Sequence, residues 1–177
     1  MPNWCDNRIT IHGPKKYIRK IDKIVNENTN GDGLLNYMMP MPTELKDTTS
    51  PSSSAKKPQP VVDGHDNWYD WRVNNWGTKW ELCEFFGMDL QDPEDSDEAT
   101  ISFSCQSAWS PPLGALEYFD MNTECSVKCS YYEGGMDFMG IWSSDEGDRC
   151  WSISDTCLRD IRILCNIIIT YRNGFLG

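Results

Sequence analysis

Alternation of apolar and polar residues predicts the strands of this chain. Residues 7–12 set Ile9 and Ile11 against Arg8 and Thr10, which is typical of a strand with one buried face. Four more segments follow the same pattern, the first of them less regularly than the others: 77–88, 99–106, 125–132 and 136–142. A Glu-Gly-Gly turn of the hairpin type separates the last two. We therefore expect five strands, the last two of which form a hairpin.

Apolar residues at helical spacing predict two helices. The first covers 14–27, with Pro14 at its first position, and the second covers 111–121, where Ser110 precedes Pro111 as a capping residue. The polar face of the first helix carries five basic residues, which form either a solvated face or an anion-binding patch: Lys15, Lys16, Arg19, Lys20 and Lys23.

The order of these elements predicts an α+β protein with a ferredoxin-like βαββαβ plan. Its antiparallel sheet has two helices on one face and an added hairpin strand. We expect one domain over 1–145, with an irregular segment at 34–42 that packs on the core. A polar, Ser- and Pro-rich insertion at 43–66 is expected to be mobile. Residues 146–177 are expected to form a C-terminal extension packed on the same domain, as a helix and strand or as one edge strand.

Charge narrows the classes of partner. The 177 residues include 16 basic and 27 acidic ones, for a formal net charge of -11. A general nucleic-acid binder needs a basic surface, so we exclude that class. Six acidic residues cluster between two of the predicted strands: Asp89, Asp92, Glu94, Asp95, Asp97 and Glu98. They serve solubility alone, or they form a surface that mimics nucleic-acid charge and binds a basic partner.

The eight cysteines do not follow metal-site spacing. There is no Cys-x-x-Cys pair, and the chain has two histidines, His12 and His65. We expect reduced, buried thiols and neither a metal nor another cofactor. No long apolar run or leader segment is present, so we expect no membrane span and no secretion.

Tryptophan and lysine gather in the middle of the chain, where 74–80 reads Asn-Asn-Trp-Gly-Thr-Lys-Trp. In one interpretation the indoles form a core whose N–H groups bond to nearby polar residues. In the other they form a pocket that stacks on a planar group, while polar residues and a lysine bind its charged part. The candidate ligand-binding residues are Asn75, Trp76, Thr78, Lys79, Trp80, Trp109, Ser110 and Glu133.

Catalytic motifs are missing from the sequence. It holds no phosphate-binding Gly-x-x-x-x-Gly-Lys loop and no Gly-x-Ser-x-Gly elbow. His12 ends a predicted strand, His65 lies in the insertion, and Glu133 with Asp137 is a weak carboxylate pair. We therefore expect a protein that is not an enzyme, and we name no catalytic residue.

Five ordered segments resemble the YubB-type ferredoxin-like domain, a small family of bacteriophages, plasmids and prophages. The resemblance spans about residues 1–142 and rests on these segments: 2–7, 34–42, 75–80, 108–112 and 132–140. It implies a mobile-element protein that acts in the bacterial cytoplasm, and the family brings no established activity.

Three hypotheses about function follow. The first is a non-enzymatic accessory protein whose acidic surface inhibits a host or defence protein that has a basic surface. The second is a protein that binds or sequesters a nucleotide-like small molecule through the Trp/Lys pocket. The third is an enzyme of unknown chemistry. The sequence predicts no oligomeric state.

Overall fold

The alternating segments of the sequence form one antiparallel sheet. The structure is a computed structural model that describes residues 3–27 and 33–155. Its strands are β1 (Trp4–Pro14), β2 (Cys83–Gln91), β3 (Glu98–Ala108), β4 (Ser126–Glu133), β5 (Phe138–Ser143) and β6 (Gly147–Ser152). They lie in the order β2-β3-β1-β4-β5-β6, and each neighbouring pair is antiparallel.

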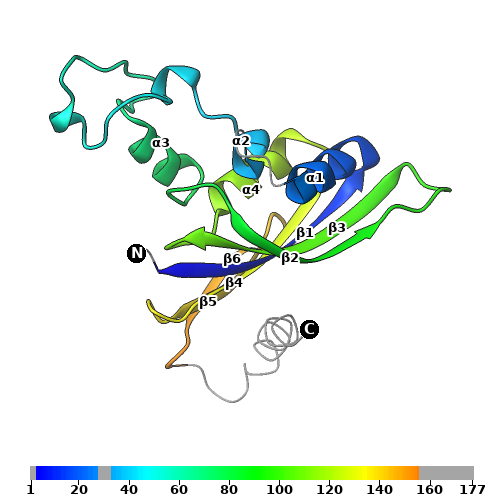
Figure 1. Cartoon of the computed structure of the whole chain (residues 1–177). Coiled ribbons are helices and arrows are strands. Elements are labelled where there is room, and N and C mark those ends of the chain that lie inside the picture. Colours follow the sequence, from blue (N-terminus) through cyan, green and yellow to red (C-terminus); the bar gives the residue numbers. More distant parts are fainter. Residues whose placement is uncertain (1–2, 28–32, 156–177) are drawn as a thin grey trace.

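Helices lie on one face of this sheet and beyond one of its ends. They are α1 (Lys15–Glu27), α2 (Leu34–Met38), α3 (Trp68–Asn75) and α4 (Leu113–Asn122), with short 3-10 turns η1 (Thr43–Leu45) and η2 (Ser52–Ser54). Figure 1 shows α1, α2 and α4 above the sheet, with α3 and the insertion beyond one end of it. The α+β class predicted from the sequence is therefore confirmed.

Central strand β1 shows why the sheet has one buried face. Its residues alternate, so that Ile9 and Ile11 are fully buried while Arg8 and Thr10 are partly exposed. On the buried face, Ile9 lies between Phe103 and Cys129 in the register of the three central strands. The apolar residues of α1 and α4 close this core, and they are Ile18, Ile21, Val25, Ala115, Leu116 and Phe119.

Several predicted boundaries were wrong. Helix α1 begins at Lys15, because Pro14 still belongs to β1. Residues 34–42, expected to be irregular, begin with the short helix α2, and Pro40 and Pro42 follow that helix. Helix α4 begins after Pro112 and has no side-chain cap. The hydroxyl of Ser110, the predicted cap, donates instead to the Gly77 carbonyl.

The largest error concerns 68–91. The expected strand at 77–88 begins only at Cys83, and residues 68–75 before it form the unpredicted helix α3. The side chain of Asn67 caps α3 by accepting a hydrogen bond from the backbone N–H of Asp70. The expected connection at 89–98 is shorter, because β2 extends to Gln91 and β3 begins at Glu98.

The C-terminal extension adds a sixth strand to the five that we expected. Residues 144–146 form a turn, after which the chain returns along β5 as β6. The Tyr131 hydroxyl donates a 2.6 Å hydrogen bond to Asp148, which ties β6 to the core. The rest of the predicted extension, 156–177, lies outside the described residues.

The insertion at 43–66 forms a loop closed by its own side chains. The Gln59 amide donates to the carbonyls of Thr49 and Asp66, and its oxygen accepts from the Thr49 N–H. Asn67 donates to Ser52 and Asp66, which fixes the loop to the start of α3. The mobility of this insertion stays a prediction.

Within 3–27 and 33–155, no helix has the length and apolar character needed to cross a membrane.

Candidate functional site

The central tryptophan motif divides into a core half and a surface half. Trp76 is fully buried, and its indole N–H donates a 2.8 Å hydrogen bond to the Met39 carbonyl. Its ring meets that of buried Trp71 edge to face, with 5.9 Å between the centroids. Trp76 is thus satisfied within the core, as the first of our two interpretations expected.

Three aromatic rings surround the ammonium of Lys79. Its Nζ lies 4.5 Å from the centroid of Trp80, 5.0 Å from that of Trp109 and 5.6 Å from that of Tyr69. The rings come from α3, from the segment after it and from the turn that follows β3. Each contact of this kind contributes about 0.5–1 kcal/mol at an exposed site.

These residues form an exposed surface. Trp80 and Trp109 keep 36% and 40% of their surface in solvent, and Trp4 keeps 38%. Trp4 packs on Trp80 with 6.1 Å between ring centroids. We call the set Trp4, Tyr69, Lys79, Trp80 and Trp109 the aromatic–lysine face.

Thr78 and Ser110 hold this face together from behind. The Thr78 hydroxyl donates to the Ala108 carbonyl at 2.8 Å, and the Ser110 hydroxyl donates to the Gly77 carbonyl at 2.5 Å. These two bonds cross-link the turn that carries Trp80 to the turn that carries Trp109. Both hydroxyls were candidates for ligand contact, and the structure gives them positioning roles.

Backbone strain also marks this surface. Trp109 adopts a φ of 70°, a left-handed conformation that bulky residues rarely take. Its N–H donates a 2.9 Å hydrogen bond to the Asn3 carbonyl at the start of β1. Strain of this kind costs about 1–3 kcal/mol and persists where the surroundings hold it, often at functional sites.

The side chains of Asn75 and Glu133 form hydrogen bonds with nearby backbone groups. The Asn75 amide donates to the Trp71 carbonyl inside α3 at 2.8 Å. Glu133 is 3% exposed, and its carboxylate accepts hydrogen bonds from the N–H groups of Gly135 and Met136 in the β4–β5 turn. Neither side chain joins the aromatic–lysine face through a described contact.

Arg72 and Glu81 lie close to the tryptophan motif in the chain, and sequence analysis did not select them. The Arg72 guanidinium lies 5.3 Å from the Trp68 ring and 4.7 Å from the Trp76 ring. Burial lowers its pKa, an effect that the nearby carboxylate of Glu81 opposes. Glu81 accepts hydrogen bonds from the N–H groups of Leu35 and Asn36 and so caps α2. The four-residue spacing of Trp68 and Arg72 was the one signal for this arrangement.

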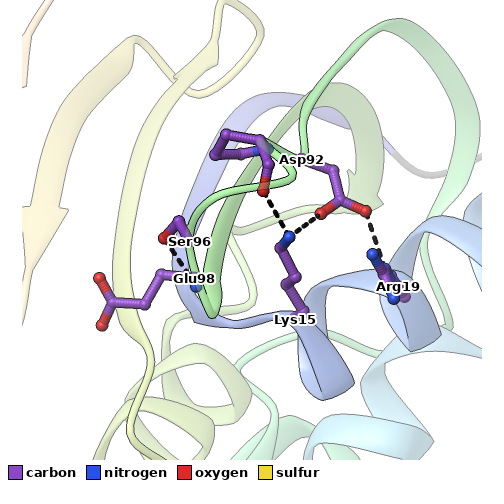
Figure 2. A network of polar contacts seen from close by, with 6 residues as sticks. Lys15, Arg19, Asp92, Ser96 and Glu98 are labelled. Carbon is purple, nitrogen blue, oxygen red and sulfur yellow. Dashed lines mark hydrogen bonds and ion pairs between the residues drawn. The ribbon is translucent and has the colours of Figure 1, made fainter.

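The acidic hairpin between β2 and β3 is partly neutralised. Figure 2 shows Asp92 between Lys15 and Arg19 of α1, at 3.0 and 2.8 Å. Hydrogen bonds from Arg19 and Lys15 lower the pKa of Asp92. Glu98 pairs with His12 at 3.2 Å. The other four predicted acidic residues are exposed: Asp89, Glu94, Asp95 and Asp97.

Ion pairs also occupy the basic face of α1. Besides the two residues that bind Asp92, Lys16 lies 3.7 Å from Glu124, and Lys23 lies 3.7 Å from Glu27 one turn on. A face paired in this way suits a solvated surface better than an anion-binding patch.

The two histidines and the buried thiols do not form a nucleophile–base pair in the described residues. His12 contacts Thr100 and Glu98, and His65 contacts Asn74. Burial raises the pKa of the thiols of Cys105 and Cys129, which opposes thiolate formation.

Comparison with known proteins adds one distant likeness. No family model matches the chain, and no curated protein matches it. The crystal structure of protein api92 from Yersinia pseudotuberculosis, described with the family model DUF1281, has a TM-score of 0.42 and 9% sequence identity to it. That likeness covers 88% of this chain and 96% of that chain, and at this level it carries no argument. The resemblance to the YubB-type family stays a prediction.

Proposed function

We propose that this protein acts by binding, and that the aromatic–lysine face binds a small nucleotide-like ligand. Such a ligand carries a flat ring and an anionic group. The observation that carries the proposal is the position of the Lys79 ammonium among three aromatic rings, two of which are exposed to solvent.

Each part of the face suits one part of that ligand. Stacking of a base on an aromatic side chain contributes about 1–3 kcal/mol, more than the cation–π contact that it replaces. The anionic group forms a charge-assisted hydrogen bond with Lys79, which has no carboxylate partner in the described residues. The strain at Trp109 supports the proposal further, because the left-handed backbone carries a half-exposed indole and strain of this kind is frequent at functional sites.

The ferredoxin-like plan and the cellular setting belong to the same proposal. β1, α1, β2, β3, α4 and β4 follow one another in that order, and their strands lie as β2-β3-β1-β4, which supports the plan. β5 and β6 then extend the sheet as a hairpin. A mobile-element protein of the bacterial cytoplasm is the setting that the resemblance to the YubB-type family implies.

Tryptophan fluorescence tests the proposal. The protein is titrated with AMP, GMP, CMP and UMP, and the variants Trp80→Ala and Lys79→Ala are compared with Lys20→Ala. Lys20 is exposed on α1, so its removal matches the charge change at a distant place. We expect saturable quenching and, with Lys79→Ala, about tenfold weaker binding of the best nucleotide. A flat response to all four nucleotides, or an equal loss with Lys20→Ala, contradicts the proposal.

A second candidate function is inhibition of a host or defence protein with a basic surface. The contacts of Lys15 and Arg19 with Asp92 favour it, because they fix a hairpin that presents Glu94, Asp95 and Asp97 to solvent. With a net charge of -11, the whole molecule attracts a basic partner.

Capture from a host lysate over a series of salt concentrations tests this second function. We expect a basic protein whose affinity falls steeply with salt, and a weaker capture by Asp95→Asn. A captured protein whose affinity ignores both salt and Asp95→Asn contradicts the role of the acidic hairpin.

A further inference from the structure

Hydrogen bonds cross-link the two turns that carry Trp80 and Trp109, whereas no hydrogen bond in the described residues holds the ammonium of Lys79. The hydrogen bonds of Thr78 and Ser110 lock the two turns, and the N–H of Trp109 is bound to Asn3. Lys79 contributes a long, flexible side chain whose ammonium contacts the ring faces alone among the described residues. Two rings on cross-linked turns therefore contact a side chain that is free to turn away.

The geometry points to a gate. Resting on the proposed function, we infer that the planar ring of the ligand takes the place of the Lys79 ammonium against the rings of Trp80 and Trp109. Lys79 then turns outward and binds the anionic group of the same ligand. Lys79 thus has two opposed effects, since it competes with the ring and attracts the charge.

Because Lys79 has two opposed effects, the gate makes a prediction that a lysine which only attracts the anion would not make. Removing the Lys79 side chain frees the space for a ring and at the same time removes the partner of an anion. A neutral nucleoside should therefore bind Lys79→Ala more tightly than it binds the wild type. The matching nucleotide should bind the variant more weakly.

Calorimetric titration with AMP and adenosine tests this inference. We expect Lys79→Ala to bind adenosine about threefold to fivefold more tightly and AMP about tenfold more weakly than the wild type, since one exposed cation–π contact is lost and one charge-assisted bond is lost. Lys20→Ala serves as the control and should change neither affinity. Lys79→Met keeps the length of the side chain without its charge, so it should bind AMP weakly and show no gain for adenosine.

The outcomes separate the inference from the proposed function. If Lys79→Ala weakens AMP and adenosine alike, the gate is wrong and the face still binds nucleotides. If Lys79→Ala weakens AMP and leaves adenosine unchanged, the lysine only attracts charge, and the gate is again wrong. If wild-type protein binds neither AMP nor adenosine and Lys79→Ala binds neither, both the gate and adenine recognition at this face fail.

Discussion

Single residues decide which tryptophans are core and which are surface. Trp76 and Trp80 lie four positions apart in one motif, yet the first is fully buried and the second is 36% exposed. The difference follows from the end of α3 at Asn75 and from the φ of 86° at Gly77, which turn the chain outward. A motif that the sequence presents as one unit therefore serves two purposes.

The two indoles should respond differently to truncation. Trp76→Ala leaves a cavity and an unpaired Met39 carbonyl, so we expect a loss of about 3–5 kcal/mol in the free energy of unfolding. Trp80→Ala should cost about 1 kcal/mol, because much of that ring is already in solvent. Urea unfolding of the two variants measures both values, and equal losses would show that the division into core and surface is wrong.

The strained backbone of Trp109 should lower the free energy of unfolding, while its ring contributes to nucleotide binding. Glycine adopts a φ of 70° without strain, so Trp109→Gly should be more stable than Trp109→Ala by about 1 kcal/mol, although both lose the ring. Both variants should also lose nucleotide binding. Urea unfolding compares their stabilities, and a glycine variant less stable than the alanine variant would contradict the strain at this position.

At the scale of elements, two carboxylates fix short segments to the helices. Asp92 joins the β2–β3 hairpin to α1, and Glu81 joins the start of β2 to α2. Their pKa values shift in opposite directions. Hydrogen bonds from Arg19 and Lys15 lower the pKa of Asp92, and burial raises that of Glu81.

Asp92 should stabilise the hairpin only where it is ionised. Because its pKa in the folded protein lies below the ordinary value of 3.8, its contribution is complete above that pH and is lost as the pH falls through the lowered value. Hydrogen exchange should therefore show faster opening of the hairpin in Asp92→Asn at neutral pH. Asp95→Asn is the matched control, and equal exchange in both variants would mean that Asp92 does not brace the hairpin.

Glu81 should have the opposite pH dependence. Its folded-state pKa lies above 4.5, so the folded protein keeps a proton that the unfolded chain has already released. The free energy of unfolding contributed by this group therefore decreases as the pH rises from 4.5 through the raised pKa. Glu81→Gln should remove this decrease, which urea unfolding at several pH values measures. The same slope in wild type and variant would rule out Glu81 as its source.

Elements with a regular pattern were predictable from sequence. Apolar and polar residues alternate around Ile9 and Ile101 because each of the two strands has one buried face. The side chains of Ile9 and Ile101 are both fully buried. Helix α3 was not predictable, because its aromatic residues have only moderate helix propensity and its start depends on the capping side chain of Asn67. Lys79, Trp80 and Trp109, three of the candidate ligand-binding residues, lie together in the structure, while their role in binding stays a prediction. The ring of Tyr69 was missed because its position depends on α3.

On the scale of the whole molecule, exposed acidic residues lie on several elements. Asp89, Glu94, Asp95 and Asp97 lie on the β2–β3 hairpin, and Asp145, Glu146 and Asp148 lie at the β5–β6 turn, whereas the aromatic–lysine face lies where β1 begins and β3 ends. Lys79 therefore offers a local positive charge on a protein whose net charge is -11. Such a site suits a small anion, which needs one contact, and disfavours a long polyanion, which the remaining surface repels.

The most direct test of this account follows the indole N–H signals of the eight tryptophans by NMR during titration with AMP, GMP, CMP and UMP. For at least one nucleotide, we predict that the Trp80 and Trp109 signals shift together and saturate. The Trp76 signal, whose N–H is bound to Met39 in the core, should stay in place. Unchanged Trp80 and Trp109 signals with all four nucleotides, or equal shifts of all eight signals, would contradict binding at the aromatic–lysine face.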